Sequence, residues 1–406
     1  MKFWRGASSR LLKAEDLIFS HRRLSVFGYS FLAAWLVAFT IRFFAAGWLF
    51  DRAGHPTFID FIQWFVGGKF ALMRDATVAY DYSAFSAAQT LVTKSKPPIT
   101  YFPWVYPPTM LLLVAPLALL PYTAAFFVWL VGTFCVYAVA LYTILPGLLA
   151  IVLALLPLPV INNVFNGQTA FLTAGLLGLL LAFANRRPYL SGICLGILTY
   201  KPQFVLFFPL ALVITRQWRV VASATASALL FVGAACLMFG PRVWLLFMHS
   251  LRGHNSATLL PVNLEGVNQT VFGLMHEAGA GPLAAWVVHL AVALFMTMLA
   301  CQIWQRPVPH ALKSAAFSIG VLTVTPYMLL YDLTAAAVPA AFIIADAVAH
   351  GFFPGERFVL LGCFLALYLC LTFAAGPIVL LALMGLVVRR VRYATKTSAT
   401  IYANSR

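Results

Sequence analysis

The sequence predicts an all-α polytopic membrane protein. Among its 406 residues, 62% are apolar and only 9% are charged, and the mean hydropathy is +0.91. Long apolar runs alternate with short polar connections, and about 20 apolar residues in a helix span the hydrocarbon core of a bilayer. Within that core, helices satisfy their own backbone hydrogen bonds. We therefore expect one integral-membrane domain over residues 1–406.

The basic residues predict the orientation of the chain. Most of the 27 lysines and arginines fall on alternate connections between apolar runs, and the last group forms a basic tail over residues 389–406. Positively charged connections stay in the cytoplasm, so we expect both termini there, in a bacterial cytoplasmic membrane. The net charge of +16 then reflects topology and contact with membrane lipids. We expect no nucleic-acid partner, and no obligate protein partner is evident.

About ten apolar runs predict membrane-spanning helices, and two irregular segments bring the expected total to about 10–12. The runs lie near residues 24–50, 109–120, 123–145, 169–184, 220–240, 283–304, 314–330, 333–349, 358–374 and 377–388. Two outer loops are expected over 51–104 and 241–282. The first should carry an interfacial helix at 58–73, with Phe61, Phe65 and Leu72 facing lipid.

Two segments do not fit simple crossings of the membrane. Residues 148–163 must leave and return on the outer side, and residues 189–215 lie between two basic connections. About ten apolar residues flank Lys201-Pro202 on either side, enough for roughly half a bilayer. We predict a broken, re-entrant pair with Lys201 at its tip. Gly192 and Gly196 in its first half would let a neighbouring helix approach closely.

Asp60 is the leading candidate for a catalytic residue. The chain holds only 11 acidic residues, and this one lies in the first outer loop between Phe58, Phe61 and Trp64. A carboxylate at the membrane edge has a raised pKa and can act as a general base. The alternative is a solvated loop acid or a helix cap.

Other polar residues on the outer side are candidates for binding a sugar, a phosphate or an acceptor. Lys201 precedes a helix-breaking proline and is a candidate phosphate ligand, with Arg252 and Lys69 as further cations. The candidates for sugar or acceptor binding are Trp64, Asn166, Gln168, Asn268, Tyr331 and Asp332. The alternatives are a snorkelling lysine, turns, helix caps and an ordinary surface loop.

The sequence predicts neither a metal nor a nucleotide cofactor. The eight histidines lack metal-ligand spacing, and the six cysteines lie in apolar runs without a C-x-x-C pair. No glycine-rich nucleotide loop is present.

Short motifs follow one another in a definite order along the chain. They are Asp60 with Trp64, Tyr106-Pro107-Pro108, Asn166-Gly167-Gln168-Thr169, Arg186-Arg187-Pro188, Lys201-Pro202-Gln203, Arg216-Gln217-Trp218-Arg219, Asn268-Gln269, and the segment from Pro326 to Asp332. In this order and spacing, the chain resembles glycosyltransferase family 87 of the GT-C superfamily over nearly its whole length.

The resemblance implies a GT-C-type helical bundle that transfers a sugar, usually mannose, from a polyprenyl-phosphate donor. It implies an inverting hexosyltransferase whose active site faces the outer side of the membrane, with a lipid or glycan acceptor. It also implies a catalytic aspartate in the first outer loop, which corresponds to Asp60. Relatives carry paired histidines after the late proline, whereas this chain reads Tyr327-Met328-Leu329-Leu330-Tyr331-Asp332.

The residue inventory suits this chemistry. A lipid phosphate is already an anionic leaving group, so one base and a phosphate-binding cation are sufficient. Asp60 and Lys201 would supply them if both lie at one outer-face hollow. Two alternatives stay open, a transporter or flippase of lipid-linked glycans and a non-catalytic membrane assembly subunit. Against transport, the chain lacks an inverted repeat and a pair of acids in mid-membrane.

Overall fold

The computed structural model describes Glu15 and residues 18–45, 47–57, 59–94, 103–155, 157–254 and 268–404. Across these ranges the chain is helical, and its only strand-like feature is an isolated bridge between Phe50 and Pro56. The predicted all-α class is therefore confirmed. Backbone N–H and C=O groups inside a bilayer have no water to bond to, so long apolar segments satisfy them within helices. This explains the uniform secondary structure.

Eighteen α-helices and four short 3-10 helices (η) follow one another in the described ranges. In chain order they are α2 (His21–Phe44), α3 (Phe61–Leu72), η1 (Ala76–Tyr80), α4 (Tyr82–Thr93), α5 (Pro108–Val114), η2 (Ala115–Leu119), α6 (Tyr122–Ile144), α7 (Leu148–Leu155), α8 (Leu158–Asn166), α9 (Ala170–Phe183), α10 (Pro188–Leu198), η3 (Pro202–Phe204), α11 (Phe208–Ile214), α12 (Trp218–Phe239), α13 (Arg242–His254), α14 (Val271–Glu277), α15 (Pro282–Gln305), α16 (His310–Val324), η4 (Leu330–Ala336), α17 (Ala337–His350), α18 (Glu356–Leu369) and α19 (Gly376–Asn404).

Five helical segments of the described chain are long and apolar enough to span a membrane: α2, α6, α12, α15, and η4 with α17. The bent pair α7 and α8, whose axes differ by 56°, would be a sixth if it forms one span. The expected total of 10–12 spans stays a prediction, because helices such as α9 and α16 fall below the length of a full crossing.

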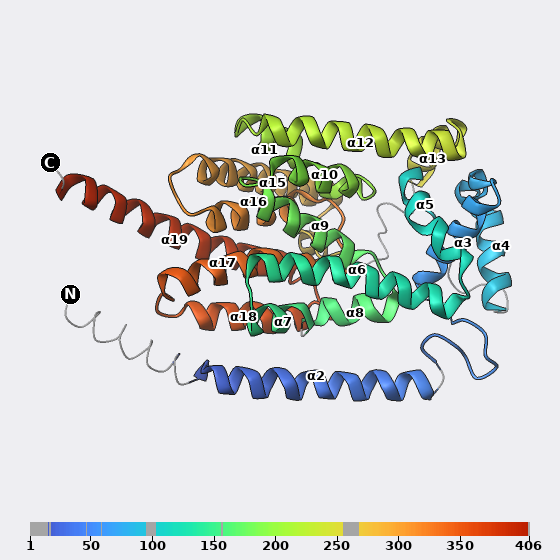
Figure 1. Ribbon diagram of the computed structural model, residues 1–406, viewed down its shortest axis with the longest axis horizontal. Helices are drawn as coiled ribbons and strands as arrows, with labels where there is room; N and C mark the ends of the chain where they lie inside the picture. The colour runs from blue at the N-terminus through green and yellow to red at the C-terminus, as the bar shows by residue number, and fades with distance from the viewer. Residues whose placement is uncertain are drawn as a thin grey trace.

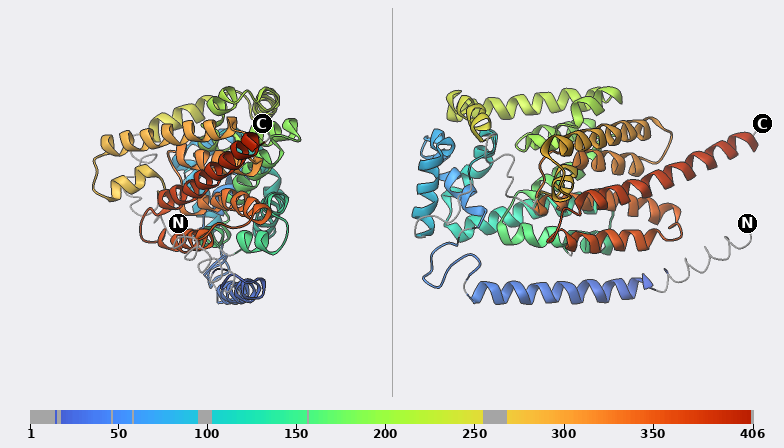
Figure 2. Two further views of the ribbon diagram at one scale, coloured as in Figure 1. Left: turned by 90° about the vertical axis from the view of Figure 1, so that its left-hand side faces the viewer. Right: turned by 180° about the vertical axis from the view of Figure 1, so that it is seen from behind.

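The helices run side by side along the long axis of the molecule (Figure 1). The start of α2 and the end of α19 lie at one end of this bundle, while α3, α4, α5 and α13 gather at the other end (Figures 1 and 2). α13, from the second predicted outer loop, thus lies beside η1 of the first, away from the start of α2 and the end of α19.

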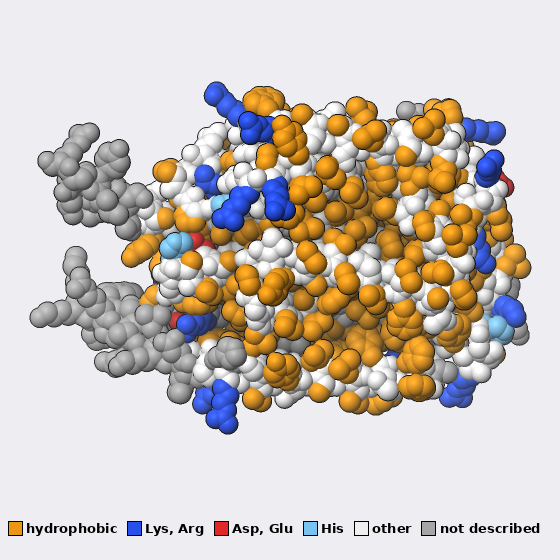
Figure 3. Space-filling view, viewed as in Figure 1, with side chains coloured by type: hydrophobic (Ala, Val, Ile, Leu, Met, Phe, Trp, Pro, Cys, Tyr) orange, Lys and Arg blue, Asp and Glu red, His pale blue; other side chains and the backbone are white. Residues whose placement is uncertain are grey.

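Apolar and basic side chains occupy different parts of the surface, as expected for a membrane protein. In Figure 3 hydrophobic side chains cover the middle of the molecule, and lysines and arginines gather toward its two ends. Side chains such as Leu230 and Leu237 on α12 are 75% and 92% exposed. A long apolar helix with so little cover suits a face in contact with lipid.

The predicted interruption at Lys201-Pro202 is confirmed. α10 ends at Leu198 and α11 begins at Phe208, with only η3 between them. The predicted close packing is also confirmed, because a side chain at Gly192 or Gly196 would collide with Ser223 or Ser227 of α12. The re-entrant path itself stays a prediction.

The prediction of a lipid-facing interfacial helix at 58–73 is wrong. α3 forms there, but Phe61 and Phe65 are 0% and 5% exposed, and only Leu72 is open at 40%. The ring of Phe61 packs on Tyr122, and α3 contacts α5 and η2. α5 and η2, which follow in the chain, cover this apolar face of α3, so the face is not in contact with lipid.

The predicted basic tail at 389–406 includes a buried arginine, Arg390. α19 continues through the described part of this region, and Arg390 is 2% exposed. Its Nη1 lies 2.7 Å from Oδ2 of Asp346, and its Nε lies 2.7 Å from Oε1 of Glu356. A buried guanidinium needs such carboxylate partners, and α17 and α18 provide them.

Candidate active site

Asp60 stands immediately before α3, yet its side chain does not cap that helix. Its Oδ2 instead accepts a hydrogen bond from Nε2 of Gln168, at 2.7 Å. The residue as a whole is neither fully buried nor fully exposed. This geometry argues against the helix-cap alternative.

Burial raises the pKa of Asp60 to about 6, and the hydrogen bond from Gln168 opposes part of this rise. Asp60 lies outside the membrane-spanning helices. A carboxyl group with this pKa is ionised at neutral pH but binds a proton more strongly than an ordinary aspartate. Both properties suit a general base.

Gln168 belongs to a sharp turn between α8 and α9. Gly167 has a φ of +63°, and a Cβ there would lie 2.8 Å from the Phe126 ring. The carbonyl oxygen of Gly167 accepts hydrogen bonds from Nε1 of Trp64 at 3.1 Å and Nε1 of Trp129 at 3.0 Å. Two indoles from α3 and α6 therefore hold the turn that presents Gln168 to Asp60.

A second charged pair lies behind this turn. Nζ of Lys201 forms an ion pair with Oδ1 of Asp332 and donates a hydrogen bond to Oγ1 of Thr169, at 3.3 Å. The backbone N–H of Thr169 donates to Oε1 of Gln168, at 3.2 Å. A chain of contacts through Gln168 and Thr169 thus links Asp60 to Lys201 and Asp332. The common outer-face hollow that we expected for the two charges stays a prediction.

Lys201 differs from the open cation that we predicted. It is 2% exposed, its partner Asp332 is 1% exposed, and the ammonium lies over the rings of Phe204 and Tyr331. A buried ammonium needs a counter-ion, and Asp332 fills that need. Asp332 is likewise committed, since its Oδ2 accepts from the N–H of Leu329 at 3.1 Å. Their roles in binding phosphate, sugar or acceptor stay predictions.

Two tyrosines near Asp60 were not among the predicted site residues. Burial raises the pKa of Tyr106 far above its ordinary value, and the nearby carboxylates of Asp332 and Asp60 add to the rise. Burial and the same carboxylates raise the pKa of Tyr327. Both phenols therefore keep their protons and can donate hydrogen bonds. Tyrosines at a membrane boundary are typical anchors, so the sequence alone did not distinguish them.

The comparison with known proteins decides the family. The model of glycosyltransferase family 87 matches residues 104–332, more than half of the chain. The chain belongs to glycosyltransferase family 87. The match includes Gln168, Lys201 and Asp332, whereas Asp60 precedes it. Neither the curated proteins nor the solved structures gave a match.

Three predicted binding residues of this membrane glycosyltransferase have structural contacts. Trp64 is 0% exposed and donates to the Gly167 turn, so its predicted role in sugar or acceptor binding needs a correction to a structural one. Asn166 donates through Nδ2 to the carbonyl of Asn162 within its own helix, at 2.9 Å. Asn268 accepts the N–H of Met328 at 3.3 Å and so positions the segment that carries Tyr331.

Lys69, another predicted phosphate ligand of the family 87 chain, does not join this cluster in the described structure. Lys69 is on α3, nine residues beyond Asp60, or about 14 Å along the helix axis. Its ammonium lies over the Phe65 ring, 4.7 Å from the centroid. Arg252 falls in α13, but its side chain lies outside the described residues.

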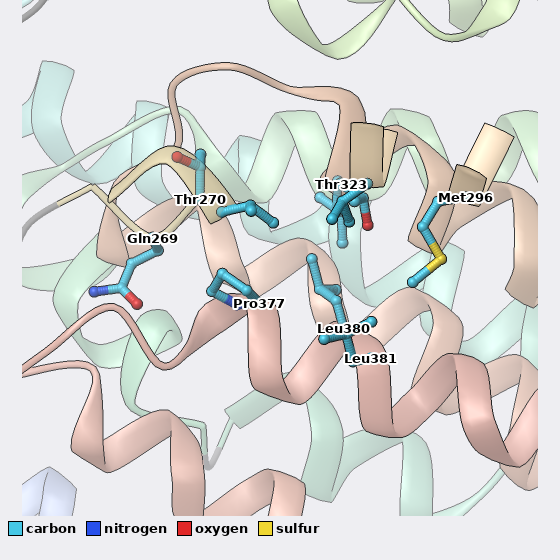
Figure 4. Close-up of a pocket in the computed structure, with 10 residues that line it drawn as sticks. Gln269, Thr270, Met296, Thr323, Pro377, Leu380 and Leu381 are labelled. Carbon is cyan, nitrogen blue, oxygen red and sulfur yellow. The ribbon is translucent and has the colours of Figure 1, made fainter. Parts of the chain in front are cut away.

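Two cavities of the enzyme lie away from Asp60. One is lined by Gln269, Thr270, Met296, Thr323 and Leu380 among others, and its volume of about 10 Å³ would hold at most one water molecule (Figure 4). The other, about 780 Å³, lies between α15 and α19. Within the described residues, no group of three or more His, Cys, Asp or Glu side chains is placed to hold a metal ion.

Proposed function

We propose that this family 87 enzyme transfers a hexose, with mannose as the first candidate, from a polyprenyl-phosphate donor to a lipid or glycan hydroxyl. The reaction would occur on the outer face of a bacterial cytoplasmic membrane, with both chain termini in the cytoplasm. The observation that carries this proposal is the half-buried carboxylate of Asp60, which has a raised pKa and is oriented by Gln168.

In the proposed reaction, Asp60 takes the proton of the acceptor hydroxyl. The acceptor oxygen then forms a bond to the anomeric carbon while the bond between that carbon and the phosphate oxygen breaks. The departing lipid phosphate takes the bonding electron pair. A single displacement of this kind inverts the anomeric centre, and the anionic leaving group needs no general acid.

The surrounding residues would support this step in different ways. Gln168 orients the base, and the Lys201–Asp332 ion pair holds Thr169 and therefore the turn behind it. The protonated phenols of Tyr106 and Tyr327 can donate to oxygens of the sugar or the phosphate. A phosphate that reached Lys201 would share its ammonium with Asp332. No metal or nucleotide is required by this scheme.

A flippase of lipid-linked glycans and a non-catalytic assembly subunit are the alternatives. Neither explains why a carboxylate with a raised pKa is oriented by Gln168 at the predicted outer end. Membership of a glycosyltransferase family also favours bond formation over transport.

The decisive experiment uses purified enzyme in liposomes with polyprenyl-phosphate [¹⁴C]mannose and a membrane lipid extract, in the presence of EDTA. We expect a labelled product in which mannose is bonded to the acceptor, with release of polyprenyl phosphate. Movement of intact donor across the bilayer without a new bond would support the flippase instead. Equal transfer from GDP-mannose in protein free of polyprenyl phosphate would rule out the proposed donor.

A further inference from the structure

The larger cavity forms a groove near the end of the bundle that carries the end of α19, away from Asp60 (Figure 1). α15 and α19 both pack on α16, and the groove of about 780 Å³ runs between them. Its volume falls within the range of small-molecule sites. The catalytic proposal makes no use of it.

The walls of this groove are apolar over most of its length. Leu381, Gly385 and Val388 follow one another on the same face of α19, and Phe295 and Leu299 face them from α15. Leu381 and Phe295 are 51% and 62% exposed. Large exposed apolar side chains in a groove mark a surface that an apolar ligand covers. A hydrocarbon chain fits this lining.

The far end of the same groove is basic. Arg389 and Arg392 line it and are both exposed. Arg389 is held in place, because its Nη1 donates to the carbonyl of Pro354 at 3.0 Å and its guanidinium lies over the Phe353 ring. Guanidinium groups bind phosphate oxygens through paired, charge-assisted hydrogen bonds.

The nearby carboxylates do not neutralise these two arginines. Asp346 and Glu356 are both bound by the buried Arg390. Among the described residues, neither Arg389 nor Arg392 forms an ion pair with an acid. Their charge is therefore available to an anionic ligand from the membrane.

From Leu381 to Arg392 the groove passes from apolar to basic over about 17 Å of helix. A membrane phospholipid has the same order of groups, an apolar acyl chain followed by an anionic phosphate. We propose that the groove between α15 and α19 binds one anionic phospholipid, with an acyl chain along Leu381 and Phe295 and its phosphate on Arg389 and Arg392.

Gly385 provides a direct way to block this site. Gly385 lines the groove, and a Cβ built on it meets no atom within 4 Å, so the backbone there has room for a side chain. Replacing a helical glycine also removes its conformational penalty. Gly385→Leu should therefore leave the free energy of unfolding unchanged or raise it, while filling the space for the acyl chain.

The experiment is native mass spectrometry of the detergent-solubilised full chain, titrated with phosphatidylglycerol or with phosphatidylcholine of the same acyl chains. We expect one phosphatidylglycerol to bind more tightly than phosphatidylcholine. Arg389→Gln and Arg392→Gln should each weaken phosphatidylglycerol about fivefold and leave phosphatidylcholine unchanged. Gly385→Leu should weaken both lipids. Arg186→Gln, an exposed arginine between α9 and α10, is the matched control and should change neither.

Three results would overturn the proposal. Equal affinity for the two lipids would exclude recognition of the charge. If Arg186→Gln lost as much affinity for phosphatidylglycerol as the groove variants, the result would show only general attraction between basic side chains and anionic lipid. Unchanged binding in Gly385→Leu would exclude the acyl chain from the groove.

Discussion

Gln168 donates a hydrogen bond to Asp60, with 2.7 Å between Nε2 and Oδ2, across 108 residues of sequence. The contact joins the start of α3 to the turn between α8 and α9. It holds one oxygen of the carboxylate and so fixes the direction of the other. Oε1 of the same amide accepts the N–H of Thr169, whose Oγ1 accepts from Lys201. The Asp60 carboxylate is thereby linked to the buried Lys201–Asp332 ion pair.

Replacing Asp60 by asparagine should lower the transfer rate by about 10²–10⁴-fold, because the acceptor hydroxyl loses its base. Binding of the donor should change much less. The measurement is initial rate against donor concentration in liposomes. Asp75→Asn removes an exposed acid near α3 and serves as the control, with a rate close to that of the natural chain. A similar rate in both variants would contradict the assignment of Asp60.

The rate should rise with pH and level off above about 6, as the Asp60 carboxyl loses its proton. Gln168 donates to the ionised carboxylate and lowers its pKa, so Gln168→Leu should move the midpoint to higher pH. The measurement is kcat/KM from pH 4.5 to 8.5 for both proteins. A midpoint that stays in place, or moves to lower pH, would argue against Asp60 as the titrating group.

Stability should also respond to the charge on Asp60. Its pKa of about 6 in the folded chain exceeds the ordinary value of 3.8, so the folded state binds the proton more tightly. This contribution is fully present below about pH 4 and is lost as the pH rises to 6. Thermal unfolding in detergent should show the loss in the natural chain and a smaller one in Asp60→Asn. Identical pH profiles would contradict the raised pKa.

Lys201→Met should destabilise the protein by about 3–5 kcal/mol, because it leaves the Asp332 carboxylate buried without a counter-ion. The double variant Lys201→Met with Asp332→Leu should be less destabilised than this single variant. Chemical unfolding of the four proteins in a double-mutant cycle measures the coupling. Lys69→Met is the control, with an expected loss below about 1 kcal/mol. Additive losses in the cycle would exclude a coupled buried pair.

Gly167→Ala should destabilise the turn by at least about 1–2 kcal/mol, since φ is +63° there and the new Cβ meets the Phe126 ring. The turn presents Gln168, so transfer activity should fall as well. Gly132→Ala on α6 is the matched control, because its Cβ meets no atom within 4 Å and the helix gains in propensity. If both variants unfolded at the same temperature, the turn would not need glycine.

Much of the helical framework was predictable from apolar run length and from proline. The run at 123–145 corresponds to α6 at Tyr122–Ile144, and the run at 220–240 corresponds to α12 at Trp218–Phe239. Both lengths follow from the thickness of a bilayer. The break at Lys201-Pro202 was predictable because proline interrupts a helix. The burial of α3 was not predictable, because an apolar helix face can pack equally well against lipid or against other helices.

The sequence by itself determined the helical membrane class and the main apolar segments, and it marked Asp60, Gln168 and Lys201 as candidate site residues. Those features depend on composition and on local backbone preference. Only the tertiary structure decided that Gln168 reaches Asp60, that Lys201 is neutralised by Asp332, and that Arg390 is buried. The packing of the helices determines which charged residues, far apart in the chain, become partners. A charge removed from water is stable only beside a partner of opposite charge, and packing brings that partner to it.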